Sequence, residues 1–207
     1  MKYYLSSFKI GNKPSDYFSL LDSEKSIGYI ANALDHMIGE NDDWLEEHIA
    51  SDVEMLKELD LDVRVVDLKE YFGKQEELQN MLSHLSGVWL SGGNVFVLRQ
   101  AMKLSGFDSI ITSGSLPDNF VYSGYSAACC VLSPTLEPYR EASNPLAMPY
   151  AELKETIWDG LGVLDFAYMP HFKSEHSESA SIDAEIKYCI ENGIPYRGYM
   201  DGEVLIL

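Results

Sequence analysis

The stretch that decides the fold is Phe120-Val121-Tyr122-Ser123-Gly124-Tyr125-Ser126-Ala127-Ala128, where an apolar run ends at a serine followed by small residues. The apolar run predicts a buried strand, and the small residues predict a tight turn into a short helix. Such a turn exposes the serine hydroxyl beside the free N–H groups of a helix N-terminus, which favour a developing negative charge. The alternative is an ordinary serine helix cap, and the stretch by itself favours the cap.

Strand-like and helix-like segments alternate on both sides of this stretch, which predicts a layered α/β fold. Irregular composition at 105–119 and 134–159 predicts loops over the site. We expect strands at 3–6, 27–31, 63–66, 88–90, 120–125, 163–169, 195–200 and 204–207, with helices after 42, at 78–85, at 95–102, after Ser126 and at 182–190.

The chain has 207 residues, of which 46% are apolar, and this predicts a single domain over 1–207 with one sizeable core. No apolar run approaches the roughly 20 residues that cross a bilayer. The N-terminus resembles a strand and lacks the apolar segment of a signal peptide. The odd count of three cysteines, two of them adjacent, favours a reduced chain in the cytoplasm.

The net charge is −18, from 15 basic and 33 acidic side chains. A field of this sign repels nucleic acid and anionic membranes, so we expect neither as a partner. No dinucleotide fingerprint or phosphate-binding loop is present, and we expect no cofactor. The oligomeric state is left open, with a homodimer as one option.

Three other predicted strands or strand-like segments end in polar residues. Gly92-Gly93-Asn94 follows one, His171 follows another and Asp201 follows a third. Ligands bind at the carboxyl ends of strands in open α/β sheets, so we expect these groups to meet Ser126 at one edge of one sheet. Each also has an ordinary interpretation, respectively a turn capped by Asn94, a structural histidine and a turn aspartate.

A serine becomes nucleophilic when a nearby base takes its proton, and the imidazole of His171 suits neutral pH. A carboxylate should orient that imidazole, and Asp201 is the best candidate. The other candidate acids are Asp165, Glu175 and Glu178. His48 and His84 lie in predicted helices, and we assign no role to His36.

A second interpretation of His171 and His176, with Glu175 and Glu178 close by, is a metal site. No H-E-x-x-H or paired-cysteine motif occurs, so we expect no metal. We interpret Cys129 and Cys130 as small buried side chains and not as nucleophiles.

Together these residues resemble peptidase family S51, which contains peptidase E (aspartyl dipeptidase) and cyanophycinase. The resemblance runs over most of the chain. It implies one three-layer α/β domain related to the class I glutamine amidotransferases, with a mostly parallel sheet, helices on both faces, and a Ser-His-acid triad in that order. Ser126, His171 and Asp201 fit this order.

The resemblance implies a role for each matching residue. Ser126 is the nucleophile, His171 the base, and Asp201 stands where peptidase E has a glutamate. The oxyanion would be bound by the N–H groups of Gly93 and Ala127, and the residues lining the substrate site would be Gly92, Asn94, Tyr125 and His176.

Two departures from the family pattern concern the elbow and the specificity. Peptidase E has G-x-S-A-G, whereas Ala128 takes the last place here. Peptidase E also selects aspartate through an arginine after the histidine, and residues 176–182 contain no arginine or lysine. We therefore expect hydrolysis of a small peptide or amide, but not aspartyl dipeptidase activity. The alternatives are an esterase or acyltransferase, and a non-catalytic binding protein on the same scaffold.

Overall fold

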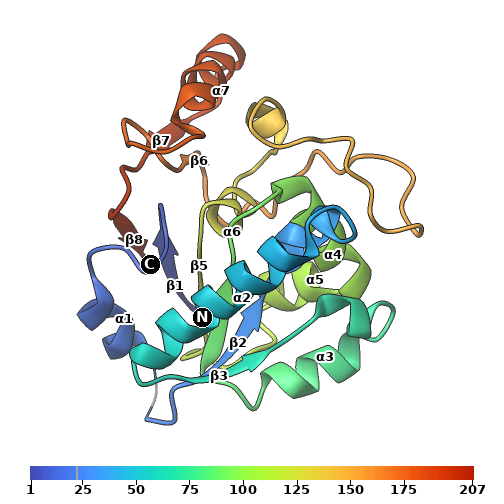
Figure 1. Cartoon of the computed structure of the whole chain (residues 1–207), viewed down its shortest axis with the longest axis vertical. Helices are drawn as coiled ribbons and strands as arrows, with labels where there is room; N and C mark the ends of the chain where they lie inside the picture. Colours follow the sequence, from blue (N-terminus) through green and yellow to red (C-terminus); the bar gives the residue numbers. More distant parts are fainter. Residues whose placement is uncertain (22) are drawn as a thin grey trace.

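The computed structural model describes residues 1–21 and 23–207 and centres on a six-stranded sheet (Figure 1). The strand order is β3-β2-β4-β5-β1-β8, and neighbours are parallel except for β8, which runs antiparallel to β1. This confirms the predicted mostly parallel α/β fold. The strands are β1 (Lys2–Ser6), β2 (Ser26–Ile30), β3 (Asp62–Val65), β4 (Gly87–Leu90), β5 (Val121–Tyr125) and β8 (Val204–Ile206).

Successive residues of the central strands belong to two different cores. In β1, Tyr4 packs into one core and Leu5 into the other, and Trp89 and Leu90 divide in the same way in β4. Side chains alternate across a pleated sheet, so both faces of these strands are buried and apolar residues occupy successive positions in them. This is why short apolar runs could be recognised as strands.

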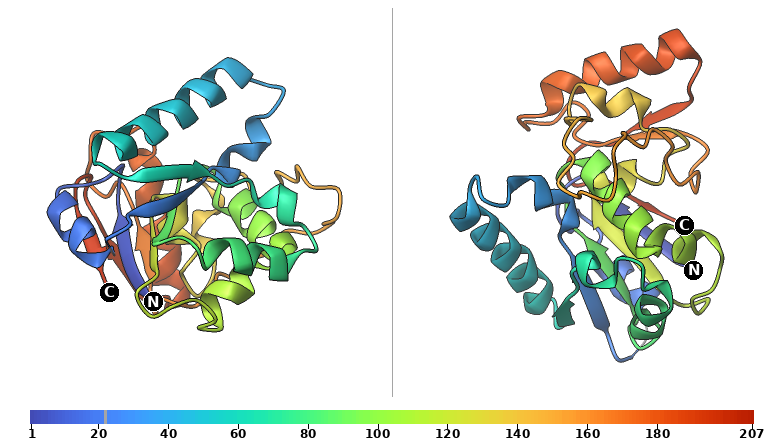
Figure 2. Two further views of the ribbon diagram at one scale, coloured as in Figure 1. Left: turned by 90° about the horizontal axis from the view of Figure 1, so that it is seen from below. Right: turned by 90° about the vertical axis from the view of Figure 1, so that its right-hand side faces the viewer.

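Helices cover both faces of the sheet. Figure 2 shows α2 on one side and the green helices α3 to α5 on the other. The face of Tyr4 and Trp89 packs against α1 (Pro14–Leu20) and α2 (Asp42–Glu58). The opposite face packs against α3 (Gln75–Leu82), α4 (Val95–Ser105), α5 (Phe107–Thr112) and α6 (Ala127–Cys130).

A second, two-stranded parallel sheet lies apart from the main one, beside α7 (Ser179–Asn192) (Figure 1). It consists of β6 (Ala167–Met169) and β7 (Tyr196–Gly198). The prediction that all strand ends share one sheet is therefore wrong. The strand predicted at 163–169 is also shorter than expected, because the amides of Leu161 and Leu164 bond to carbonyls of the loop after α6.

The connections contain three short 3₁₀ helices: η1 (Asn32–Met37), η2 (Leu68–Tyr71) and η3 (Glu137–Arg140). The segment 105–119 is more regular than predicted, because α5 begins directly after Gly106, whose φ of 76° ends α4. Within residues 1–21 and 23–207, the helices are too short or too polar to cross a membrane.

Candidate active site

Ser126 lies on a strained turn between β5 and α6. Its backbone angles are φ 51° and ψ −111°, a conformation that side-chain-bearing residues rarely adopt. Gly124 makes the turn sterically feasible. A Cβ at that position would lie 2.4 Å from the Leu90 carbonyl oxygen and 2.7 Å from the Ala128 methyl group. Ala128, which departs from the pattern of peptidase E, therefore fits because its methyl group lies over Gly124.

Backbone hydrogen bonds hold this elbow in place. The Ser126 amide donates to the Ser6 carbonyl over 3.3 Å, and the Ser126 carbonyl accepts from the amides of Cys129 and Cys130 at 2.8 and 3.0 Å. The side chain does not cap α6. The hydroxyl makes no hydrogen bond within residues 1–21 and 23–207, although the residue is only 8% exposed. The helix-cap interpretation of Ser126 is therefore wrong, and the hydroxyl is available for chemistry.

Gly93 and Ala127 bring two backbone amides beside the same cavity. Neither amide donates a hydrogen bond within the part of the chain that the structure describes. Gly93 has a φ of 135°, and a Cβ there would lie 2.7 Å from the Ala33 carbonyl oxygen, so glycine is required. Asn94 is a helix cap, accepting from the amides of Phe96 and Val97 at the start of α4.

His171 and Asp201 form a direct hydrogen bond, with 2.7 Å between Nδ1 and Oδ1. They follow β6 and β7, the neighbouring strands of the small sheet. The imidazole is 1% exposed and the Asp201 side chain 26% exposed. Of the other candidate acids, Asp165 and Glu175 are exposed, and among the described residues neither forms a hydrogen bond or ion pair with His171.

Ser7 connects this pair to the main sheet, and sequence analysis assigned it no role. Its hydroxyl accepts a hydrogen bond from the His171 amide over 2.8 Å. The same hydroxyl lies 3.0 Å from Asp201 Oδ1 and 3.1 Å from the Tyr199 carbonyl oxygen, either of which can accept its single proton. Because Ser7 directly follows β1, it fixes the small sheet relative to the end of the main sheet.

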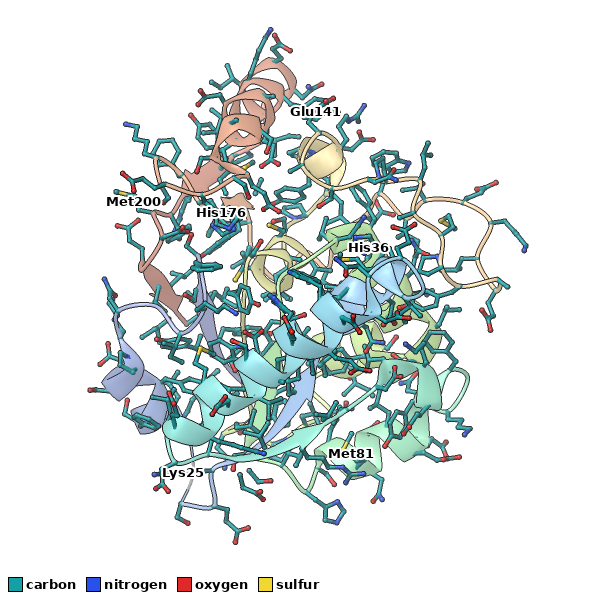
Figure 3. All side chains as sticks on the ribbon, in the orientation of Figure 1. Lys25, His36, Met81, Glu141, His176 and Met200 are labelled. Atoms are coloured by element: carbon teal, nitrogen blue, oxygen red, sulfur yellow. The ribbon has the colours of Figure 1, made fainter. Side chains whose placement is uncertain are left out.

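The imidazole of His171 is enclosed by other rings. His176, labelled in Figure 3, stacks on it with 3.7 Å between ring centroids, and Phe8 contacts it edge-on at 5.8 Å. Burial lowers the pKa of His171, while the hydrogen bond to Asp201 acts in the opposite direction. The neutral imidazole, the form that acts as a base, is therefore favoured at neutral pH.

His171 and Ser126 line one cavity but are not hydrogen-bonded to each other. The Nε2 atom of His171 instead lies 3.7 Å from Glu178 Oε2. Catalytic hydrogen bonds are often long in unliganded sites and shorten when substrate binds. The position of both side chains in one cavity is therefore compatible with proton transfer between them.

His171, His176 and Glu178 also offer donor atoms within 4.8 Å of one another, a spacing that could hold a metal ion.

Two cavities meet at Ser126. One extends toward α7 and contains the Gly93 and Ala127 amides together with Glu185. The other contains His171 and His176 and extends toward α2, where Trp44 and His48 form its wall. Of the predicted lining residues, Gly92, Tyr125 and His176 belong to the second cavity, whereas Asn94 lies beside the site as a helix cap.

A buried carboxylate that sequence analysis did not identify supports the second cavity. Asp52 of α2 is fully buried and accepts hydrogen bonds from the hydroxyls of Tyr29 at 3.0 Å and Tyr125 at 2.7 Å. It also pairs with Lys9, and His48 lies 3.8 Å away. Tyr125 directly precedes Ser126, so this network holds α2 against the elbow. The helical pattern around 45–59 gave no reason to expect an acid on its buried face.

Comparison with known proteins assigns this arrangement to a family. Peptidase family S51 matches residues 19–204, which is most of the chain. The chain belongs to peptidase family S51. This membership supports a peptidase or related hydrolase, and the matched region contains Ser126, His171 and Asp201.

The individual proteins that match this chain have low sequence identity to it. The uncharacterized peptidase Lin0382 of Listeria innocua serovar 6a is 28% identical over 87 residues, which is 42% of this chain and only 39% of that protein. A candidate peptidase E from Listeria monocytogenes EGD-e has the same fold, with a TM-score of 0.71 and 19% identity over 100% of this chain and 97% of the other. A peptidase from an acI-B1 Actinobacterium gives a TM-score of 0.67 and 14% identity, covering 100% and 82%.

Proposed function

We propose that this S51 chain is a serine hydrolase that cleaves a small peptide or amide. Ser126 is the nucleophile, His171 the general base, and Asp201 orients the imidazole. The observation that carries the proposal is the 2.7 Å contact between His171 and Asp201, because His171 lines the same cavity as the Ser126 hydroxyl, which makes no hydrogen bond within the described residues. A strained turn presents that hydroxyl, as nucleophile elbows do.

The reaction follows from these positions. Ser126 Oγ attacks the substrate carbonyl while His171 Nε2 takes its proton, giving a tetrahedral oxyanion. The N–H groups of Gly93 and Ala127 bind the oxyanion. His171 then returns the proton to the leaving amine as the C–N bond breaks, and Ser126 keeps the acyl group. Water attacks the acyl-enzyme with His171 again as base, which releases the acid and restores the serine.

An aspartate-specific dipeptidase is not supported by this site. The cavity between Ser126 and α7 is lined by two acidic residues, Glu178 and Glu185, and in the described part of the chain by no lysine or arginine. An aspartyl side chain would find no cationic partner in this lining, which disfavours its binding. The substrate therefore differs from that of peptidase E.

A dipeptide library digested by the pure protein and analysed by mass spectrometry tests the proposal. We expect cleavage that Ser126→Ala abolishes and that excess EDTA leaves intact, because no step uses a metal ion. Cleavage retained in Ser126→Ala, or lost with EDTA and restored by a divalent cation, would contradict a serine mechanism. Matched amide and ester substrates separate a peptidase from an esterase.

A further inference from the structure

The cavity between Ser126 and α7 contains a carboxyl group with no partner. Glu185 of α7 is 1% exposed, and its Oε2 atom is buried without a hydrogen bond in the described residues. A carboxylate in this position is costly unless a donor or a cation satisfies it. The lining includes no lysine, arginine or histidine among the described residues, so no cation of the protein satisfies it there.

Among the described residues, the titratable side chains that line the cavity with Glu185 are all acids. Glu178 is the second carboxylate of the lining, and Cys130 and Tyr139 are its other titratable residues. Both Cys130 and Tyr139 have pKa values raised well above their ordinary range, mainly by burial, so both are neutral. Among the described residues, no basic side chain in the cavity lining is available to pair with Glu185 when it ionises.

The position of this cavity identifies which half of a substrate it receives. His171 must protonate the leaving amine, so the leaving group lies on the side of His171 and His176, in the cavity walled by Trp44. The cavity of Glu185 contains the oxyanion-binding amides but neither histidine. It adjoins the cavity walled by Trp44, with which it shares Gly93, Ser126 and Glu178, and it leaves space beside Ser126 for the side chain of the acyl residue.

We propose that this cavity is the subsite for the acyl residue and that it selects a basic side chain, with Glu185 as the direct partner of the cation. Such a side chain is slender and ends in an N–H donor, as in lysine, ornithine or arginine. It would supply the hydrogen bond that Glu185 Oε2 lacks. The cavity has about 20 Å³ of space for the centre of a water-sized group, which is room for a terminal ammonium group. The inference rests on the proposed serine hydrolase function and specifies its substrate class.

The protonation of Glu185 agrees with this assignment. Burial, with a smaller contribution from Glu178, raises the pKa of Glu185 to about 8. An ammonium or guanidinium group entering the cavity would favour the ionised carboxylate and displace its proton. Selectivity for a basic side chain should therefore increase as the pH rises from 6 to 9.

Aminoacyl amides that release a fluorescent amine test the assignment. Lysine and norleucine are compared, because they differ chiefly in the terminal ammonium group. We expect a wild-type kcat/KM at least about tenfold higher for lysine. In Glu185→Gln that ratio should fall toward one. Glu191→Gln, on the exposed face of the same helix, is the matched control and should keep the wild-type ratio.

Labelling by a fluorophosphonate separates the two ways this test can fail. If wild type and Glu185→Gln are both labelled at Ser126, the nucleophile and the fold are intact. A lysine-to-norleucine ratio near or below one in labelled wild type, or an unchanged ratio in labelled Glu185→Gln, would then overturn the subsite assignment alone. Absence of labelling in folded wild type would overturn the serine hydrolase and the subsite together.

Discussion

His171 Nδ1 lies 2.7 Å from Asp201 Oδ1, although the two residues are 30 positions apart in the chain. The ends of two neighbouring parallel strands, β6 and β7, bring them together. The contact fixes the orientation of the ring and directs Nε2 away from Asp201. Because a carboxylate stabilises the imidazolium that forms during the reaction, it should matter more for kcat than for folding.

Asp201→Asn should lower kcat by about 10²- to 10⁴-fold, since an amide can hold the wrong imidazole tautomer and carries no charge. Circular dichroism and thermal melting should change little, because the Asp201 side chain is partly exposed. Steady-state kinetics on the best substrate of the library digest measures the effect. Activity within twofold of wild type would contradict the proposal that Asp201 orients the imidazole of His171.

The pH dependence of kcat/KM should report His171. Its pKa is lowered from the ordinary 6.5, mainly by burial. The base acts only when neutral, so activity is present above this pKa and is lost as the pH falls through it. We expect kcat/KM to fall at a pH below 6.5 in wild type. In Asp201→Asn the fall should come at a still lower pH, because the variant loses the hydrogen bond that raises the pKa of His171. A fall above pH 7 in wild type would contradict the assignment of the base.

Asp52→Asn should destabilise the fold by about 2–3 kcal/mol, because Lys9 and two tyrosine hydroxyls lose their common ionised partner. Urea unfolding followed by fluorescence measures the change. The matched control is Asp60→Asn, whose carboxylate is 95% exposed and lies 3.3 Å from Lys25, and it should change stability by less than about 0.5 kcal/mol. Equal effects of the two substitutions would contradict a structural role for Asp52.

Glu185→Gln should remove a pH-dependent loss of stability. The pKa of Glu185 is raised from 4.5 to about 8. Between these values the unfolded chain has lost a proton that the folded chain keeps, so stability is highest below 4.5 and falls as the pH rises through 8. Relative to wild type, the variant should gain about 2–4 kcal/mol between pH 5 and pH 9. Parallel urea titrations at pH 5, 7 and 9 check this, and equal pH slopes would contradict it.

The apolar strands and the elbow could be predicted from sequence because their signals are local. The run ending at Tyr125 is apolar on both sheet faces, and the small residues after Ser126 are adjacent to it in the chain. Asp201 could be proposed from its strand-end position and the family resemblance. Asp201 and its partner His171 were both placed on the wrong sheet, because a strand's sequence does not reveal which neighbours it pairs with.

The features that were missed depend on contacts between distant segments. Ser7, Asp52 and Glu185 lie in ordinary local patterns: a strand end, an acidic helix and the polar part of another helix. Only the packing of α2 and α7 against the site buries the two carboxyl groups. A period of 3.6 residues indicates a helix, but it does not show that an acidic residue on that helix faces a cavity.

The most direct test of the account is covalent labelling of the folded wild-type protein by a fluorophosphonate, with the modified peptide mapped by mass spectrometry. We predict one phosphonylated residue, Ser126, with labelling abolished in Ser126→Ala and strongly slowed in His171→Ala, although both variants remain folded. A folded wild type that is not labelled, or labelling at a different serine, would contradict the claim that Ser126 is an activated nucleophile.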